Sequence, residues 1–202
     1  VATGLDAGEG AGGALNTEGA IAKYLATESA LAAADAAIQA HGGYGYTRPY
    51  IVEKFRRDVR ITTIYEGTSE ILEMTTARDR WQLHLKTRGA YFADAARAVR
   101  AMHTSHPAVG ADIAALGLEC LAVVFEACRS GPLTRNQHLL LRLGELVAHA
   151  EGAAALVRRA VENRGRAFSP QVELGGVDHE HRRPAAAQEP APGDMDRLAR
   201  SA

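Results

Sequence analysis

The chain has 202 residues, of which 47% are hydrophobic, 23% charged and only 5% aromatic, and its formal net charge is -1. That length and hydrophobic share suffice for a domain with a core, and the charge balance gives no general electrostatic reason to bind nucleic acid or an anionic membrane. No apolar run approaches the roughly 20 residues that cross a bilayer. We therefore expect no nucleic-acid partner and no integral membrane segment, and in the absence of a visible targeting signal we predict a cytoplasmic protein.

The first predicted helix begins near Asn16, a candidate N-cap, with Glu18 placed to complement the helix dipole. It ends at Gly42 and Gly43, because glycine readily adopts the left-handed conformation that stops a helix. Pro49 then predicts the start of a second helix, which runs to about residue 58. Helical spacing in the first of these helices is carried by Ile21, Tyr24, Leu25, Leu31, Ala34 and Ile38.

Residues 59–67 are predicted to be extended or irregular, and Thr68 or Ser69 to cap the following helix. Glu70 would lie in the first turn of that helix. The apolar spacing continues through Trp81, which predicts one long helix as far as His106-Pro107.

Two more helices are predicted near 108–129 and 134–163, separated by Ser130-Gly131-Pro132. Short connections between helices favour antiparallel neighbours, so the predicted fold class is all-α, an antiparallel helical bundle. Residues 166–202 are rich in proline and charge, which is typical of a disordered tail.

Residues 39–46, Gln-Ala-His-Gly-Gly-Tyr-Gly-Tyr, are the first candidate site. Glycines allow a ligand to approach the backbone closely, and the Gln39 amide can both donate and accept hydrogen bonds. The alternative is that these glycines only turn the chain after a helix.

Residues 64–71, Ile-Tyr-Glu-Gly-Thr-Ser-Glu-Ile, are the second candidate site. Glu66 is a carboxylate directly before a helix N-terminus, whose free N–H groups can hold an oxyanion. A base beside such donors is what proton abstraction next to a carbonyl requires. The alternative is that Glu66 is a solvated loop residue and Thr68 an ordinary helix cap.

Taken together, three motifs resemble the C-terminal helical domain of acyl-CoA dehydrogenases: Gln-x-x-Gly-Gly-Tyr-Gly-Tyr-Thr from residue 39, Val-Glu-Lys-Phe-x-Arg-Asp-x-Arg-Ile from residue 52, and Ile-Tyr-Glu-Gly-Thr-Ser-Glu-Ile from residue 64. The resemblance extends from about Glu18 to Arg78. It implies FAD-dependent oxidation of the Cα–Cβ bond of an acyl-CoA thioester, as in fatty acid β-oxidation. The electrons would then pass to an electron-transfer flavoprotein.

The resemblance also implies roles for individual residues. Glu66 looks like the catalytic base that removes the α-proton, and Gly67 like a residue that lines the substrate path. Thr68 and Glu70 match positions that contact FAD on the same subunit. The segment that reaches a neighbouring subunit's FAD is matched by Gln39, Gly42 and Gly43, which implies a homo-oligomer, a dimer or a tetramer.

We expect four parts: a Gly-rich truncated start (1–15), the family-like helical domain (16–105), a helical extension (106–165) that resembles very-long-chain members, and the tail (166–202). A generic bundle extension used for packing is the alternative for the third part. Nothing in the sequence resembles the family's N-terminal and β-domains, and the chain starts at Val1. We therefore expect a fragment that is inactive alone. A non-catalytic helical oligomerisation or partner module is the alternative function.

The remaining polar clusters give weaker indications of function. The histidines lack Cys or carboxylate partners at metal-ligand spacing, so no metal site is expected. The basic cluster at Arg56, Arg57 and Arg60 is interpreted as solvated or ion-paired, and Trp81 as a packing anchor.

Overall fold

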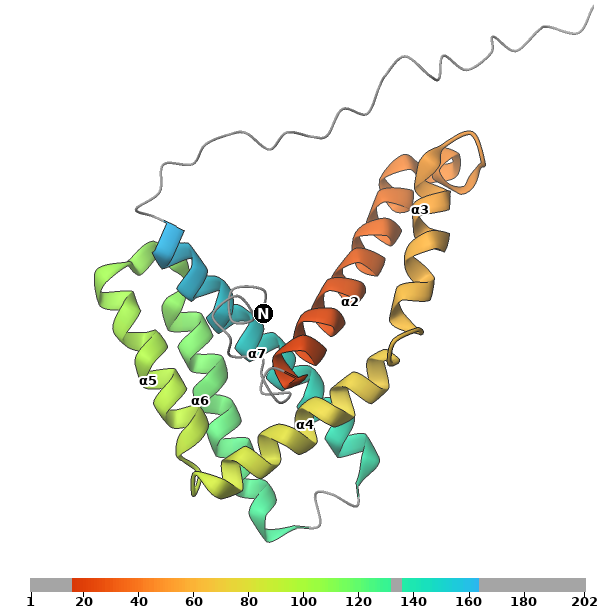
Figure 1. The fold of residues 1–202 in the computed structure, drawn as a ribbon. Coiled ribbons are helices and arrows are strands. Elements are labelled where there is room, and N and C mark those ends of the chain that lie inside the picture. The colour runs from red at the N-terminus through yellow and green to blue at the C-terminus, as the bar shows by residue number, and fades with distance from the viewer. Residues whose placement is uncertain (1–15, 132–135, 164–202) are drawn as a thin grey trace, which may run out of the picture. The chain divides into compact units, whose positions relative to one another are not determined.

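The computed structural model describes residues 16–131 and 136–163 (Figure 1). Every regular element in these ranges is a helix, which confirms the all-α fold class. The predicted Gly-rich start and the predicted disordered tail from residue 166 lie outside the described residues. The elements are α2 (Asn16–His41), η2 (Gly42–Tyr46), α3 (Ile51–Arg60), η3 (Ile61–Thr63), α4 (Ser69–Lys86), α5 (Ala90–Ser105), η4 (Pro107–Val109), α6 (Ala111–Ala127), η5 (Cys128–Ser130) and α7 (Gln137–Asn163).

Helix α2 ends at His41, directly before Gly42 and Gly43, as the sequence predicted. Gly42 has a φ of +58°, the left-handed conformation that glycine adopts most readily. Gly45 is needed for a different reason: a Cβ atom there would lie 2.6 Å from the carbonyl oxygen of Ile38. These two glycines fold η2 tightly back against α2, so that α3 returns beside it (Figure 1).

The prediction of an irregular stretch over residues 59–67 is partly wrong. Helix α3 continues to Arg60 and is followed directly by η3, so the irregular backbone is confined to residues 64–68. Hydrogen bonds close the turns here: the Thr62 hydroxyl donates to the carbonyl oxygen of Val59 (2.7 Å), and the Arg60 guanidinium donates to the Thr63 hydroxyl (2.7 Å).

The prediction of one long helix up to His106 is wrong, because the chain breaks between α4 and α5. Arg88 and Gly89 both have positive φ, +54° and +88°. The Gly89 amide donates to the carbonyl oxygen of His84 (2.8 Å), which closes the end of α4 in the manner of a helix C-terminal motif. Apolar spacing alone carried the prediction across this break, since residues on both sides face the same core.

The core lies among α4, α5, α6 and α7. Trp81 is buried and its ring stacks on that of His84, with centroids 5.9 Å apart, which confirms its role as a packing anchor. The largest apolar side chains with almost no exposed surface are Phe92, Phe125, Leu118, Leu140, Leu143, Val99 and Val147.

A buried ion cluster joins α2, α4 and α7. The Arg80 side chain is 7% exposed, and its guanidinium donates to both carboxylate oxygens of Glu151 (2.7 Å each) and to Glu18 (2.8 Å). Burial by itself disfavours the charged guanidinium, but the hydrogen bonds and charge of Glu151 outweigh it and raise the pKa of Arg80 above its usual range. The hydroxyl of Tyr91 on α5 also donates to Glu151 (3.3 Å).

The first half of α2 packs on α4 and its second half on α3. Thr17 donates to Asp79 (2.8 Å) near the start of α2, and Arg56 of α3 pairs with Asp35 further along. Arg57 pairs with Glu53 (3.4 Å), so this part of the basic cluster is ion-paired, as interpreted from the sequence.

Candidate functional site

The loop of residues 64–68, between η3 and α4, has an unusual backbone. Glu66 has a φ of +57° and Gly67 a φ of +95°, so two consecutive residues are in the left-handed region. A glutamate rarely adopts this conformation, and such a residue persists only where its surroundings determine it. The loop therefore presents the Glu66 side chain in one direction that the rest of the chain must hold.

Three contacts hold this loop. The Lys23 ammonium of α2 donates to the carbonyl oxygen of Gly67 (2.7 Å). The Ser69 hydroxyl donates to Glu28, also on α2. Thr68 is the N-cap of α4, as predicted, and its hydroxyl oxygen accepts from the Ile71 amide (3.4 Å).

The immediate surroundings of Glu66 are open. Glu66 is exposed, and within the described part of the chain its carboxylate makes no hydrogen bond or ion pair. Its neighbours Ile64 and Tyr65 are 48% and 52% exposed. An unpaired carboxylate on a held backbone, flanked by uncovered apolar side chains, is chemically able to accept a proton from a ligand that covers it.

Glu70 is the second residue of α4, two positions beyond this loop. Its carboxylate accepts hydrogen bonds from its own backbone amide and from the Thr68 hydroxyl, which hold the pKa of Glu70 below its usual range. The positive charge of Arg60 acts in the same direction. Thr68 therefore caps α4 through the Ile71 amide, and the Glu70 carboxylate lies beside it in the first turn of the helix.

The Gly-rich segment lies at the other end of α2. Gln39, Gly42 and Gly43 are all exposed. A Cβ atom added at Gly43 would meet nothing within 4 Å, whereas Gly42 and Gly45 are required by the turn. Turning the chain thus explains two of the three glycines and leaves Gly43 as open backbone beside an exposed amide side chain.

The structure does not bring the two candidate groups together on this chain. Lys23 contacts the loop, and one candidate group lies in the loop and the start of α4: Glu66, Gly67, Thr68 and Glu70. Gln39, of the other group, follows Lys23 by 16 positions on α2. At 1.5 Å per residue, the two groups are about 24 Å apart along α2.

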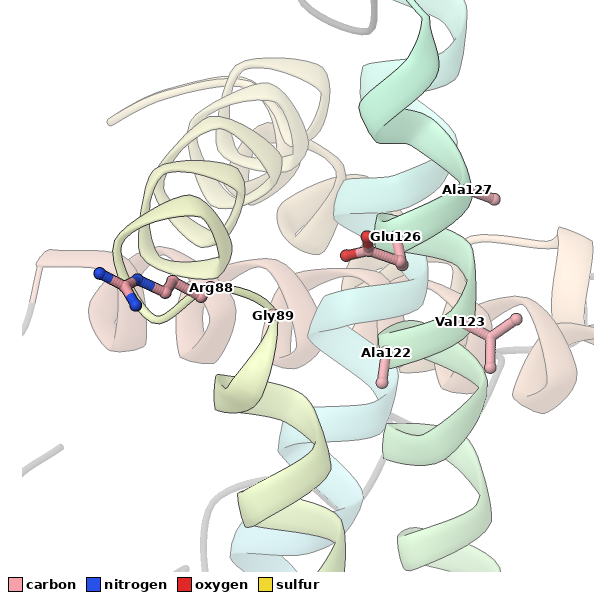
Figure 2. Close-up of a pocket in the computed structure, with 6 residues that line it drawn as sticks. All are labelled: Arg88, Gly89, Ala122, Val123, Glu126 and Ala127. Atoms are coloured by element: carbon pink, nitrogen blue, oxygen red, sulfur yellow. The ribbon is translucent and has the colours of Figure 1, made fainter.

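A surface depression lies elsewhere, at the turn between α4 and α5, and includes none of the predicted site residues (Figure 2). It is lined by Arg88, Gly89, Ala122, Val123, Glu126 and Ala127. In the described ranges, no cluster of three or more His, Cys, Asp or Glu side chains has an arrangement suited to a metal ion. None of the described helices is long and apolar enough to cross a membrane.

Residues 1–80 match the family model described as acyl-CoA dehydrogenase, C-terminal domain. This segment is thus similar to the C-terminal domain of acyl-CoA dehydrogenases. The described elements within it are α2, η2, α3, η3 and the first two-thirds of α4, and they contain every predicted site residue.

Curated relatives match over similar lengths. A 3-(aryl)acrylate reductase of Clostridium sporogenes is 48% identical over 73 residues, covering 36% of this chain and 18% of the relative. The short/branched chain specific acyl-CoA dehydrogenase of Rattus norvegicus mitochondria is 51% identical over 61 residues, 30% of this chain and 14% of the relative. The caffeyl-CoA reductase-Etf complex subunit CarC of Acetobacterium woodii is 47% identical over 57 residues, 28% and 15% respectively. The matched region thus spans less than a fifth of the length of each of these relatives.

Sequence reasoning missed the residues that hold the loop, Lys23 and Glu28. Lys23 lies between Ile21 and Tyr24 in the sequence but not on the helix face that they share, so its position gave no signal of a partner. The partner is a backbone carbonyl 44 residues away, which no side-chain motif indicates.

Proposed function

We propose that this chain carries the catalytic base of an FAD-dependent acyl-CoA dehydrogenase. Glu66 takes the α-proton of an acyl-CoA thioester while the β-hydrogen leaves with its electron pair, which produces the trans-2-enoyl-CoA. The observation that supports this most directly is the unpaired Glu66 carboxylate on left-handed backbone, held at the start of α4 within the segment that matches the family. Gly67, beside it, would line the substrate path.

We propose that this chain contacts a flavin nucleotide at two separate places. Thr68 and Glu70 offer a hydroxyl and a carboxylate at the start of α4, and Gln39, Gly42 and Gly43 offer an exposed amide and open backbone at the far end of α2. Bound FAD would supply the acceptor for the β-hydride. Because the two places are about 24 Å apart along α2, we infer that each contributes to a different FAD in a homo-oligomer, a dimer or a tetramer.

The electron acceptor and the cellular location are further parts of the same proposal. One relative is named as part of an Etf complex, which supports an electron-transfer flavoprotein as the partner of this protein. We place the protein in the cytoplasm.

The exposure of Glu66 predicts whether the purified chain has catalytic turnover. Proton abstraction from a carbon acid needs a site that excludes water, and Ile64 and Tyr65 are about half exposed here. We therefore expect the 202-residue chain alone to lack turnover, and FAD-loaded enzyme containing this chain (the holoenzyme) to have it.

The test is Glu66→Gln in the holoenzyme, assayed by dye reduction with acyl-CoA substrates. The amide keeps the shape of the side chain but cannot take a proton, so we expect kcat to fall by about 100- to 10,000-fold. FAD content and acyl-CoA binding should stay unchanged. Glu119→Gln, an exposed carboxylate on α6, is the control and should keep full activity.

Near-normal turnover of Glu66→Gln would refute Glu66 as the base. A holoenzyme without turnover toward any acyl-CoA, in either the oxidative or the reductive direction, would instead favour the alternative of a helical oligomerisation module. Size-exclusion chromatography of the chain would then give its oligomeric state directly.

A further inference from the structure

Lys23 contacts the candidate catalytic loop from outside it. Its side chain is partly buried, and its one polar contact within the described residues is the Gly67 carbonyl oxygen, 2.7 Å from Nζ. In the described ranges, Lys23 pairs with no carboxylate, unlike Lys54, which pairs with Asp58. The charged ammonium of Lys23 therefore hydrogen-bonds a neutral backbone carbonyl in the residue next to Glu66.

We propose that Lys23 is a positioning residue for Glu66. Its ammonium fixes the Gly67 carbonyl, which anchors the end of the two-residue left-handed turn and so helps to keep Glu66 in the conformation from which its carboxylate meets the substrate. The inference rests on the proposed function for the role of Glu66, and on the geometry of α2 and the loop for the role of Lys23.

The backbone conformation of Glu66 explains why the loop needs a restraint. Left-handed φ is unfavourable for a residue with a Cβ atom, so an unrestrained Glu66 would return to a right-handed or extended conformation. On its C-terminal side the loop is fixed by Thr68, which caps α4. Lys23 fixes the Gly67 carbonyl, which belongs to the peptide unit between Gly67 and Thr68, so both restraints act on the backbone directly after the two left-handed residues Glu66 and Gly67.

The same contact is not required to hold α2 on α4. Thr17 donates to Asp79 (2.8 Å), Ser69 donates to Glu28, and Arg80 pairs with Glu18 (2.8 Å), all between these two helices. When the ammonium of Lys23 is removed, these three other contacts between α2 and α4 therefore remain. The effect should be local to the loop, which makes the proposal testable in a folded protein.

The test compares Lys23→Met, Lys23→Arg and Lys54→Met in the holoenzyme. Lys54→Met is the matched control, because it removes an exposed lysine that does not touch the loop. We expect Lys23→Met to lower kcat by about 10- to 100-fold, the effect of a small misplacement of a catalytic group. KM for acyl-CoA and FAD content should stay close to wild type, and Lys23→Arg, which keeps a charged donor, should restore part of kcat.

A second measurement needs no activity. Amide hydrogen exchange at the end of the loop, measured in the purified chain at Ile71 and Leu72, whose amides donate to Thr68, should be about tenfold faster in Lys23→Met because the loop opens locally, while exchange in α6 stays unchanged. Wild-type kcat in Lys23→Met, or unchanged exchange at these two amides, would overturn the proposal. So would a loss of kcat that Lys23→Arg does not relieve at all.

Glu66→Gln, measured in parallel, separates this inference from the proposed function. Wild-type turnover of Glu66→Gln refutes the proposed function, and with it the base that Lys23 would position. Loss of turnover in Glu66→Gln together with wild-type kcat in Lys23→Met refutes the role of Lys23 alone.

Discussion

Glu66 combines two properties that are rarely found together, a left-handed backbone and a side chain without a partner in the described ranges. Backbone strain at an exposed glutamate has no benefit for stability, since a relaxed loop would solvate the carboxylate equally well. Strain of this kind concentrates at sites where a side chain must point in one direction. At the residue scale, then, the loop is better explained by what Glu66 does than by what it contributes to folding.

Glu70 gives a prediction about pH. Its folded-state pKa is lowered, first by its hydrogen bond from backbone and then by Thr68, so its contribution to stability is present above the unfolded pKa near 4.5 and is lost as the pH falls through the folded value. Glu70→Gln should therefore lower the free energy of unfolding near neutral pH. Because the side chain is exposed, the loss should be only about 0.3–1 kcal/mol.

Urea unfolding of both proteins between pH 3 and pH 7 measures this difference. The two free energies of unfolding should converge at the acid end, where the wild-type carboxyl is protonated as well. A difference that is constant across this range would contradict an electrostatic cause.

At the element scale, the crossing of α4 and α7 depends on Gly144. A Cβ atom at this position would lie 2.0 Å from the carbonyl oxygen of Glu73, within the backbone of α4. No flexible side chain can move aside to relieve that contact, so the two helices can approach this closely only with glycine here. The sequence contains many glycines and does not indicate which of them lies at a helix crossing.

The corresponding prediction compares two glycine-to-alanine variants. Gly144→Ala should destabilise the protein by about 2 kcal/mol or more, since the helices must separate to admit the methyl group. Gly117→Ala is the control: its new Cβ would lie 3.5 Å from that of Ala150, an ordinary contact. Alanine is the better helix former by about 1 kcal/mol, so this variant should be neutral or slightly stabilised.

Chemical denaturation measures both variants. Equal stability of Gly144→Ala and Gly117→Ala would show that α4 and α7 do not cross as closely as the structure has them.

At the scale of the whole described structure, the ion cluster of Arg80 joins the family-like segment to helix α7. Arg80 belongs to the residues that match the family model, and Glu151 lies 71 residues further on, outside the match. Helix α7 is therefore tied directly to α2 and α4, the two helices that hold the Glu66 loop.

Glu151→Gln tests the strength of this tie. Removing one charge leaves the buried Arg80 guanidinium with only Glu18 as a charged partner, and breaking a buried pair costs about 3–5 kcal/mol. We expect a loss toward the lower end, because Glu18 remains. Glu119→Gln breaks the exposed pair with Arg100 and should cost at most about 1 kcal/mol. Similar losses in the two variants would contradict a buried cluster.

The sequence by itself determined the all-α fold class, two local end signals and the resemblance of the first 80 residues to the C-terminal domain of acyl-CoA dehydrogenases. Thr68 caps α4 and Gly42 ends α2 as predicted, because such signals act within about four residues of the chain. Only the tertiary structure decided that the apparent single helix breaks at Arg88 and Gly89, that Lys23 holds the Gly67 carbonyl, and that Arg80 pairs with Glu151. The last two contacts join residues 44 and 71 positions apart, and they exist only because packed helices bring these groups together.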